Sequence, residues 1–321
     1  MANPIVSVSA PRKKVSMTKV FIDGSAGTTG LRIHERLKER PELEILSLPS
    51  ELRKDKGARE EIINAADIAF FCLPDAAAVE SAGLVHGNTA VIDTSTAHRT
   101  EEGWAYGFPE LHGLREKIRS SKFVANPGCH ASGFISLVEP LVYEGLISPE
   151  TALTCFSVTG YSGGGKGMIA DYEAETRAPE LDAPRQYALG QSHKHLKEMQ
   201  KICALETAPV FCPIVADYYS GMAVTVPLFK KDLRGSIGDI KALYRECYKS
   251  AIVYYEEYTE GMIAGNALAD RDDMKITVAG NEDRILLISC FDNLGKGASG
   301  AAIQNMNILL GLDETTGLVI G

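Results

Sequence analysis

Several features that would each indicate a particular class of protein are missing from this chain of 321 residues. Its apolar runs are well short of the roughly 20 residues that a membrane-spanning helix requires, so we expect no membrane segment. The formal net charge is -9 and no basic face stands out, which argues against nucleic acid as a partner. The seven cysteines are scattered and form no CxxC pair, which argues against a zinc site or a disulfide framework and favours the reducing cytoplasm.

The first 17 residues, MANPIVSVSAPRKKVSM, contain no acidic residue. They include a PRKK cluster but lack the apolar core of a signal peptide. We therefore expect residues 1–17 to form a disordered extension ahead of the fold, with Met17 as an alternative start.

Short apolar stretches alternate with helix-like stretches through the first half of the chain. The strand-like stretches are residues 19–23, 43–48, 67–73 and 90–93, and the helix-like stretches are residues 31–40, 58–65 and 76–86. Residues 67–73 (DIAFFCL) are apolar almost throughout, as expected of a strand that is buried on both faces. The alternation predicts an α/β fold with a Rossmann-like, doubly wound parallel sheet.

The pattern changes after about residue 130, where longer segments of alternating hydrophobicity appear. These segments are residues 153–160, 208–215, 222–229, 275–279 and 284–291, and the helical stretches among and after them are residues 189–204, 236–255 and 297–310. We expect an α+β domain with a mostly antiparallel sheet.

A glycine-rich loop, GSAGTTG, follows the first predicted strand and precedes a predicted helix. Gly24, Gly27 and Gly30 permit a tight turn and a close approach of the backbone, and the helix N-terminus offers N–H groups to a pyrophosphate. A tight turn that binds nothing also fits the motif, but its place in an alternating α/β segment favours dinucleotide binding. The predicted contacts are Gly24, Ser25, Ala26, Gly27, Thr28, Thr29 and Gly30.

The second predicted strand leads into LSLPSELRKD, and no acidic residue closes it. An acid at this point would bind the 2′-hydroxyl of NAD. The hydroxyls of Ser47 and Ser50 and the cation of Arg53 instead suit a 2′-phosphate, so we expect NADP(H). A solvated loop is the alternative interpretation of these charges.

Cys129 stands in NPGCHA, between a predicted strand and a predicted helix. A cysteine at a helix N-terminus is exposed to the positive end of the helix dipole, which favours the thiolate. The same N–H groups would stabilise an oxyanion on an acyl carbon. We therefore expect Cys129 to be an ionised catalytic nucleophile, whereas the other cysteines lie mainly in apolar runs and are expected to be ordinary buried thiols.

A thiolate nucleophile needs an acid/base partner, and His193 and His195 in GQSHKHLKEMQ are the candidates. Glu198 follows His195 at i+3, where its carboxylate would orient the imidazole. A polar helix start that carries surface histidines explains the same spacing equally well.

Several motifs in order resemble those of the N-acetyl-gamma-glutamyl-phosphate reductase family, and the resemblance extends over nearly the whole chain from Thr18. The motifs are GSAGTTG, DTSTAHR (93–99), YGFPEL (106–111), NPGCHA, GYSGGGK (160–166), SHKHLKE (192–198) and FDNLGKGASGAAIQNMN (291–307). Two departures from the family pattern are Lys166 in place of arginine and Lys197 in place of proline. The chain length and loops resemble the shorter subtype of the family.

The resemblance implies site residues that the spacing alone does not identify. On this basis the substrate-binding residues are Ser95, Arg99, Asn126 and Lys166, and the further cofactor-binding residues are Ser162, Gly163, Asn293 and Gly295. It also implies a fold like that of aspartate-semialdehyde dehydrogenase and glyceraldehyde-3-phosphate dehydrogenase. Residues 18–128 and 295–321 would then form the NADP-binding domain and residues 129–294 a catalytic and oligomerisation domain. A homodimer or homotetramer without a bound metal is expected.

The implied reaction is the NADPH-dependent reduction of an acyl phosphate to an aldehyde and phosphate through a thioester on the cysteine. N-acetyl-gamma-glutamyl phosphate, an intermediate of arginine biosynthesis, is the expected substrate. Aspartyl phosphate and N-acetyl-aminoadipyl phosphate are alternatives, because the same thiol chemistry serves all three. A non-catalytic NADP-binding sensor is the alternative from another functional class.

Overall fold

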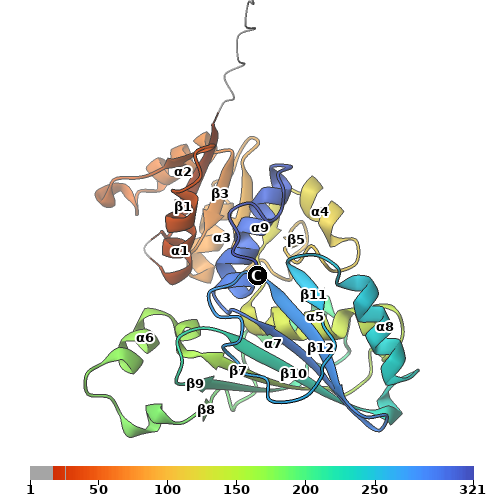
Figure 1. The fold of residues 1–321 in the computed structure, drawn as a ribbon. Helices are drawn as coiled ribbons and strands as arrows, with labels where there is room; N and C mark the ends of the chain where they lie inside the picture. The colour runs from red at the N-terminus through yellow and green to blue at the C-terminus, as the bar shows by residue number, and fades with distance from the viewer. Residues whose placement is uncertain (1–16, 26) are drawn as a thin grey trace, which may run out of the picture.

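The computed structural model describes residues 17–25 and 27–321. Residues 1–16 and Ala26 lie outside this part, and with them the predicted disordered extension and one predicted cofactor contact. The described residues form two sheets, and the chain returns to the first sheet at its C-terminal end (Figure 1). No helix in the described ranges is long and apolar enough to cross a membrane.

The first sheet has six strands, all of them parallel, in the order β2-β1-β3-β4-β6-β5. Its strands are β1 (Thr18–Asp23), β2 (Leu43–Leu46), β3 (Ile68–Phe71), β4 (Ala90–Asp93), β5 (Ala105–Tyr106) and β6 (Phe123–Ala125). The helices of this half are α1 (Thr28–Leu37), α2 (Lys56–Ala65), α3 (Asp75–Ala82) and α4 (Leu114–Ser120), with a 3₁₀ turn η1 at Ser50–Leu52. The predicted doubly wound parallel sheet is confirmed.

Alternation along the strands explains why helices cover both faces of this sheet. Val20 and Ile22 of β1 pack with α1 and with α9 (Gly300–Leu309), while Phe21, between them, packs with Ile63 of α2 on the opposite face. Successive side chains of a strand point to opposite faces, so a strand that is covered on both sides must be apolar throughout. The four residues of β3 are accordingly all buried.

The second sheet has seven strands in the order β11-β12-β13-β10-β7-β9-β8. They are β7 (Thr154–Gly160), β8 (Arg185–Gln186), β9 (Val210–Ala216), β10 (Met222–Phe229), β11 (Val253–Tyr255), β12 (Met274–Gly280) and β13 (Arg284–Phe291). Four of its six strand pairs are antiparallel, which confirms the mostly antiparallel sheet. The helices of this half are α5 (Cys129–Tyr143), α6 (Gly165–Glu173), α7 (His195–Ile202) and α8 (Ile237–Cys247).

Two helices are shorter than the sequence pattern predicts. Residues 187–194 form a loop rather than the start of α7, because Ala188 and Gln191 have positive φ angles (51° each) that a helix does not allow. The helix expected over residues 236–255 ends at Cys247, and Val253–Tyr255 pairs with β12 as strand β11. Tertiary pairing of a β-branched, aromatic segment overrides the helical spacing there.

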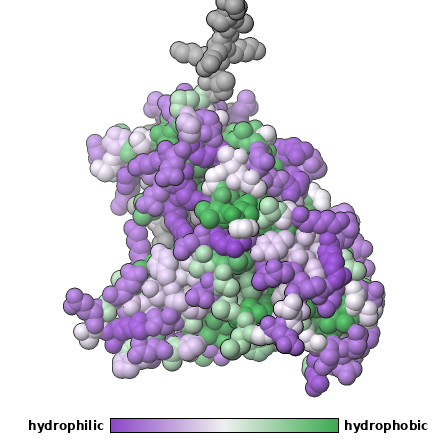
Figure 2. All heavy atoms as spheres, viewed as in Figure 1, coloured by the Kyte–Doolittle hydropathy of each residue, from purple (hydrophilic) through white to green (hydrophobic). Residues whose placement is uncertain are grey.

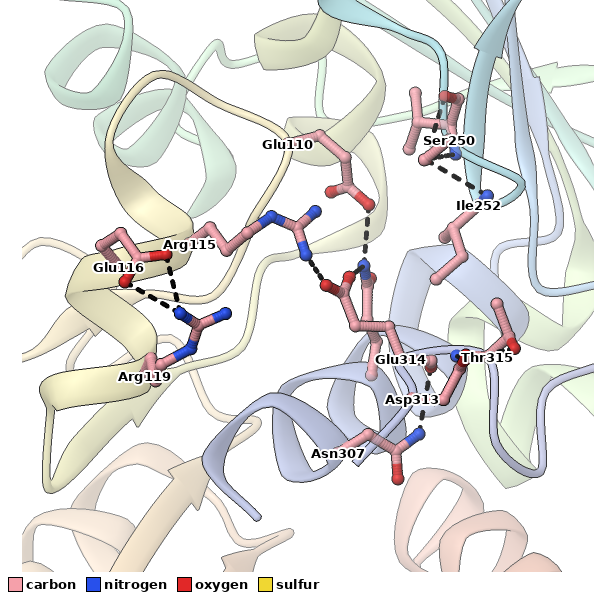
Figure 3. A network of polar contacts seen from close by, with 12 residues as sticks. Glu110, Arg115, Glu116, Arg119, Ser250, Ile252, Asn307, Asp313, Glu314 and Thr315 are labelled. Atoms are coloured by element: carbon pink, nitrogen blue, oxygen red, sulfur yellow. Dashed lines mark hydrogen bonds and ion pairs between the residues drawn. The ribbon is translucent and has the colours of Figure 1, made fainter. Parts of the chain in front are cut away.

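The C-terminal segment packs against the first sheet. Ala302, Ile303 and Met306 of α9 lie in the core of the first sheet, and Arg115 of α4 forms an ion pair with Glu314 beyond α9 (Figure 3). Asn307 donates to the backbone oxygen of Glu314 at 3.0 Å in the same network (Figure 3). The last helix is thus fixed to the first sheet both by apolar packing and by polar contacts.

Candidate active site

A cavity of about 590 Å³ lies where the carboxyl ends of the first sheet meet the second sheet. Its lining includes Gly30 of α1, Thr94 after β4, Asn126 after β6, and Thr159 at the end of β7. In a parallel sheet the carboxyl ends of all strands meet at one edge, which is the usual place for a ligand in open α/β folds.

Cys129 lines this cavity as the first residue of α5. The preceding Gly128 is the N-cap, with an extended backbone (φ −84°, ψ 144°) and no side-chain cap. A side chain at Gly128 would overlap Nε2 of His195 and Nη1 of Arg99, so glycine is required by this close approach. The Cys129 thiol, one imidazole and one guanidinium therefore lie around a single backbone position.

The predicted resting thiolate at Cys129 is wrong for this structure. Burial raises the pKa of the Cys129 thiol to about 11, although the His130 amide, the Arg99 guanidinium and the Cys129 amide act in the opposite direction. Loss of hydration disfavours the charged sulfur more than one helix turn of N–H dipoles favours it. At neutral pH Cys129 is therefore a neutral thiol.

His195 lines the same cavity as Cys129. Its side chain is buried, and within the described ranges its Nδ1 has no hydrogen-bond partner. Burial lowers the pKa of His195 well below its usual value, and the charge of Arg99 lowers it further. The imidazole is therefore neutral near physiological pH, as a proton acceptor must be.

Glu198 does not orient either imidazole, in contrast to the prediction from i+3 spacing. Its carboxylate accepts hydrogen bonds from the Tyr106 hydroxyl (2.7 Å) and the Gly128 amide (2.9 Å), and it pairs with Arg99 (3.1 Å). Between described residues, no hydrogen bond joins Glu198 to His193 or His195. The physical reason is that a buried carboxylate is drawn to a cation and two N–H or O–H donors that tertiary folding supplies.

Arg99 is held rigidly by three acceptors. Its Nε donates to the Asn126 carbonyl (2.9 Å), Nη1 to Glu198 and Nη2 to the Thr94 carbonyl (3.0 Å). A guanidinium carries five N–H groups, so two remain for another ligand. The guanidinium lines the cavity and brings a positive charge to it.

The other predicted substrate residues are not all brought together. Ser95 lines the cavity and donates to Asp93 (2.7 Å), and Asn126 lines it and donates to the Ala298 carbonyl (3.0 Å). His193 also lines the cavity, and its Nδ1 accepts from the His195 amide at 3.2 Å. Lys166, by contrast, is exposed on α6 and is not part of the lining.

The glycine loop provides a cradle of the kind that a dinucleotide requires. Gly24 has φ +89° and lies against the Cys72 carbonyl, while a side chain at Gly30 would collide with the Gly24 carbonyl at 2.5 Å. The N-terminus of α1 has no side-chain cap and no acidic residue in its first turn, which leaves its N–H groups for an anion. Gly27, Thr29 and Gly30 line the main cavity, and the Thr28 side chain lies outside the described part.

A second cavity of about 440 Å³ lies on the other side of the glycine loop. Gly24, Ser25, Ser47 and Arg53 line it, whereas Ser50 forms part of η1 and donates to Glu51 (3.1 Å) outside the lining. Two adjoining cavities, one at the nucleophile and one at the end of β2, fit the two halves of a dinucleotide.

The C-terminal cofactor candidates differ in their positions. Asn293 lines the main cavity and donates to Ser162 at 3.0 Å, and Ser162 and Gly163 line it as well. Gly295 is not in the lining, because it packs against the Arg271 carbonyl, where no side chain would fit. Gly297, two residues later, lies against Cβ of Cys129.

Comparison with known proteins agrees with this arrangement. Residues 19–121 match the semialdehyde dehydrogenase NAD binding domain, and residues 129–293 match the semialdehyde dehydrogenase dimerisation domain. N-acetyl-gamma-glutamyl-phosphate reductases of Brucella ovis and Brucella canis are each 44% identical to this chain over 306 residues, which cover 91% of it and 99% of each relative. The chain belongs to the N-acetyl-gamma-glutamyl-phosphate reductase family.

Solved structures resemble the chain in fold. Aspartate semialdehyde dehydrogenase II of Vibrio cholerae has a TM-score of 0.68 at 18% identity and covers 92% of this chain and 98% of its own. Aspartate semialdehyde dehydrogenase of Candida albicans, solved with NADP, has a TM-score of 0.66 at 18% identity, with coverage of 92% and 99%. The recognition of the reductase family and the expected semialdehyde dehydrogenase fold are both confirmed.

Three residues at this site were not among the site residues predicted from the sequence. Tyr106 donates to Glu198, while His130 and Tyr187 line the main cavity and are hydrogen-bonded to each other at 2.7 Å. His130 directly follows the nucleophile, which is a signal that could have been used. Tyr106 begins the YGFPEL motif, whereas Tyr187 carries no such local signal; their partners lie 92 and 57 residues away along the chain.

Proposed function

We propose that this chain reduces N-acetyl-gamma-glutamyl phosphate to N-acetyl-glutamate semialdehyde and phosphate, with NADPH, through a thioester on Cys129. One observation carries the proposal: Cys129 begins α5 in the same cavity as the glycine loop of α1, Arg99 and His195. Relatives that are 44% identical over nearly their whole length bear the name of this activity, and the first half matches an NAD-binding domain.

The first step is attack by sulfur on the acyl carbon. As the carbon–sulfur bond forms, the thiol proton passes to the neutral imidazole of His195, and the bond from the carbon to the phosphate oxygen breaks. The charge of Arg99 lies in the cavity to attract the phosphate, and the N–H groups at the start of α5 face the developing oxyanion. The products of this step are a thioester and inorganic phosphate.

Bound NADPH supplies the hydride that converts the thioester carbonyl carbon to the aldehyde oxidation level. The tetrahedral adduct on Cys129 then collapses to the aldehyde, and the sulfur recovers a proton from His195. A covalent intermediate keeps the carbonyl fixed in the cavity between the two steps. His193 borders the same space and is the second candidate for the proton carrier.

Cofactor binding is assigned to the segments around the two cavities. Gly24 to Gly30, Ser162, Gly163 and Asn293 would hold the dinucleotide, and Ser47 and Arg53 at the second cavity would bind a 2′-phosphate. The packing of α9 on the first sheet supports residues 18–128 with 295–321 as the cofactor domain and 129–294 as the catalytic domain. Ser50, Lys166 and Gly295 keep their predicted roles only if the loaded enzyme moves them to the ligands.

A homodimer or homotetramer is proposed through the second sheet. Large apolar side chains such as Phe156 of β7 and Leu286 of β13 are exposed there. Figure 2 shows hydrophobic surface on the half of the molecule that contains the second sheet. The match of residues 129–293 to a dimerisation domain supports an interface formed by this half of the chain. All seven cysteines are free thiols, which supports a reducing compartment such as the cytoplasm.

Reverse turnover tests the proposed function. The chain should reduce NADP when given N-acetyl-glutamate semialdehyde and phosphate, faster than with aspartate semialdehyde or N-acetyl-aminoadipate semialdehyde. Cys129→Ser should lose nearly all turnover and keep NADPH binding, while Cys247→Ser, which changes an exposed thiol, should retain activity. Wild-type rates in Cys129→Ser would contradict the covalent mechanism, and binding of NADPH without turnover of any semialdehyde would favour a sensor.

A further inference from the structure

Three residues that the proposed mechanism does not use form a hydrogen-bonded chain that ends at the cavity. The Ser157 hydroxyl on β7 lies 2.6 Å from Nδ1 of His130, and Nε2 of His130 lies 2.7 Å from the Tyr187 hydroxyl. Ser157 and His130 are buried, whereas Tyr187 is half-buried and lines the cavity with Cys129.

The need to satisfy every buried donor determines the direction of the two hydrogen bonds that link Ser157, His130 and Tyr187. Within the described part of the protein, His130 is the one hydrogen-bond partner of the Ser157 hydroxyl. A buried hydroxyl proton without an acceptor is costly, so Ser157 donates to Nδ1. Neutral imidazole has one donor and one acceptor nitrogen, and Nε2–H therefore donates to the Tyr187 oxygen. That oxygen receives its hydrogen bond from within the protein, and its own O–H is left to point at a ligand.

Within this row of hydrogen bonds, neither the His130 imidazole nor the Tyr187 phenol is an acid or base at neutral pH. Burial, together with the nearby His193, lowers the pKa of His130 to about 3, so the imidazole stays neutral. Burial raises the pKa of Tyr187 above its usual value, as does proximity to Cys129, so the phenol keeps its proton. Tyr187 can therefore act at this site only as an uncharged hydrogen-bond donor.

The backbone that carries Tyr187 is fixed by its surroundings. The Tyr187 amide donates to the Pro213 carbonyl of β9 (3.1 Å), and the Gln191 side chain exchanges two hydrogen bonds with the backbone of Phe211, also in β9 (2.7 and 2.8 Å). Ala188 and Gln191 have positive φ angles, a strained conformation that persists only where the surroundings enforce it. The loop 187–194 thus holds the phenol in one position.

We propose that the Tyr187 hydroxyl donates a hydrogen bond to the substrate's acyl oxygen, and that His130 and Ser157 are positioning residues that keep this hydroxyl oriented as a donor. This inference rests on the proposed function and adds a side-chain donor to the amides at the start of α5. The hydrogen bond from Tyr187 to the substrate's acyl oxygen becomes stronger as negative charge develops on that oxygen, during attack by Cys129 and during collapse of the adduct.

Tyr187→Phe, which removes only the hydroxyl, is the primary test in the reverse assay with N-acetyl-glutamate semialdehyde, phosphate and NADP. Loss of one oxyanion donor should lower kcat about 10²-fold, with the KM for phosphate and the Kd for NADP unchanged. Tyr258→Phe is the matched control, because that hydroxyl donates to the Gly261 carbonyl in an exposed loop. A rise in the KM for phosphate at unchanged kcat would assign the contact to phosphate and overturn the proposal, as would full activity.

A double-mutant cycle tests the two positioning residues. Ser157→Ala should lower kcat on its own, Ser157→Thr should retain it, and Ser157→Ala should cause no further loss in a Tyr187→Phe background. Losses that multiply would show that Ser157 acts through packing and would contradict the hydrogen-bonded chain. Absence of turnover by the unchanged protein contradicts the proposed function, whereas wild-type rates in Tyr187→Phe contradict this inference alone.

Discussion

Replacing Glu198 by glutamine should make the Cys129 thiol more acidic. The Glu198 charge is one of the causes that raise the pKa of this thiol, and the Arg99 charge, which Glu198 partly neutralises, lowers it. Glutamine keeps an acceptor oxygen for Tyr106 and for the Gly128 amide but removes the negative charge. Both effects favour the thiolate, so the thiol pKa falls from its value of about 11.

The size of the expected shift in the Cys129 pKa follows from how strongly the Glu198 charge acts compared with the other groups around the thiol. A charge within about 4–6 Å moves a pKa by about 1–3 units, and Glu198 ranks below burial, the His130 amide and Arg99 among the causes. We therefore expect a fall of about one unit, which means about tenfold more thiolate at any pH well below the pKa. Because the substitution leaves Arg99 without its charge partner, the free energy of unfolding should also fall by about 3 kcal/mol.

Alkylation by iodoacetamide, followed on the Cys129 peptide by mass spectrometry, measures the shift. In the cofactor-free protein the rate should rise about tenfold per unit between about pH 7 and about pH 10, and Glu198→Gln should move this line about one unit lower. Glu139→Gln is the control, because Glu139 lies on the same helix but about three turns away from Cys129. An unchanged line in Glu198→Gln, or a plateau near neutral pH in the unchanged protein, would refute the electrostatic argument.

Three further outcomes are expected. His195→Asn should slow turnover by about 10²- to 10⁴-fold in steady-state assays, and a larger loss in His193→Asn would reverse the assignment of the proton carrier. Arg53→Ala should raise the KM for NADPH more than that for NADH, and equal changes would mean that this cation lies free in solvent. Asp23→Asn should cost about 3–5 kcal/mol in urea unfolding, because it removes the carboxylate that pairs with Arg59 (3.0 Å), both being buried; a change within error would show that the pair is not needed.

Local sequence patterns predicted much of the fold and the position of Cys129 at the start of a helix. Strand and helix periodicity predicted the parallel sheet because its strands are covered on both faces and must be apolar. The Pro-Gly step before Cys129 and the apolar run after it are contiguous in sequence, so the start of α5 was readable. The α7 boundary was not, since the positive φ angles of Ala188 and Gln191 are imposed by contacts with β9.

What the sequence determined by itself is the alternation of the first sheet, most strands of the second sheet, the glycine loop and the cysteine at the head of a helix. The partner of Glu198 and the ionisation of Cys129 were decided only by the tertiary structure. Glu198 meets Arg99, which is 99 residues away, and burial in the folded protein removes hydration from the Cys129 thiol. Spacing along a chain records neighbours within a turn of helix, whereas burial and charge pairing depend on segments that only folding brings together.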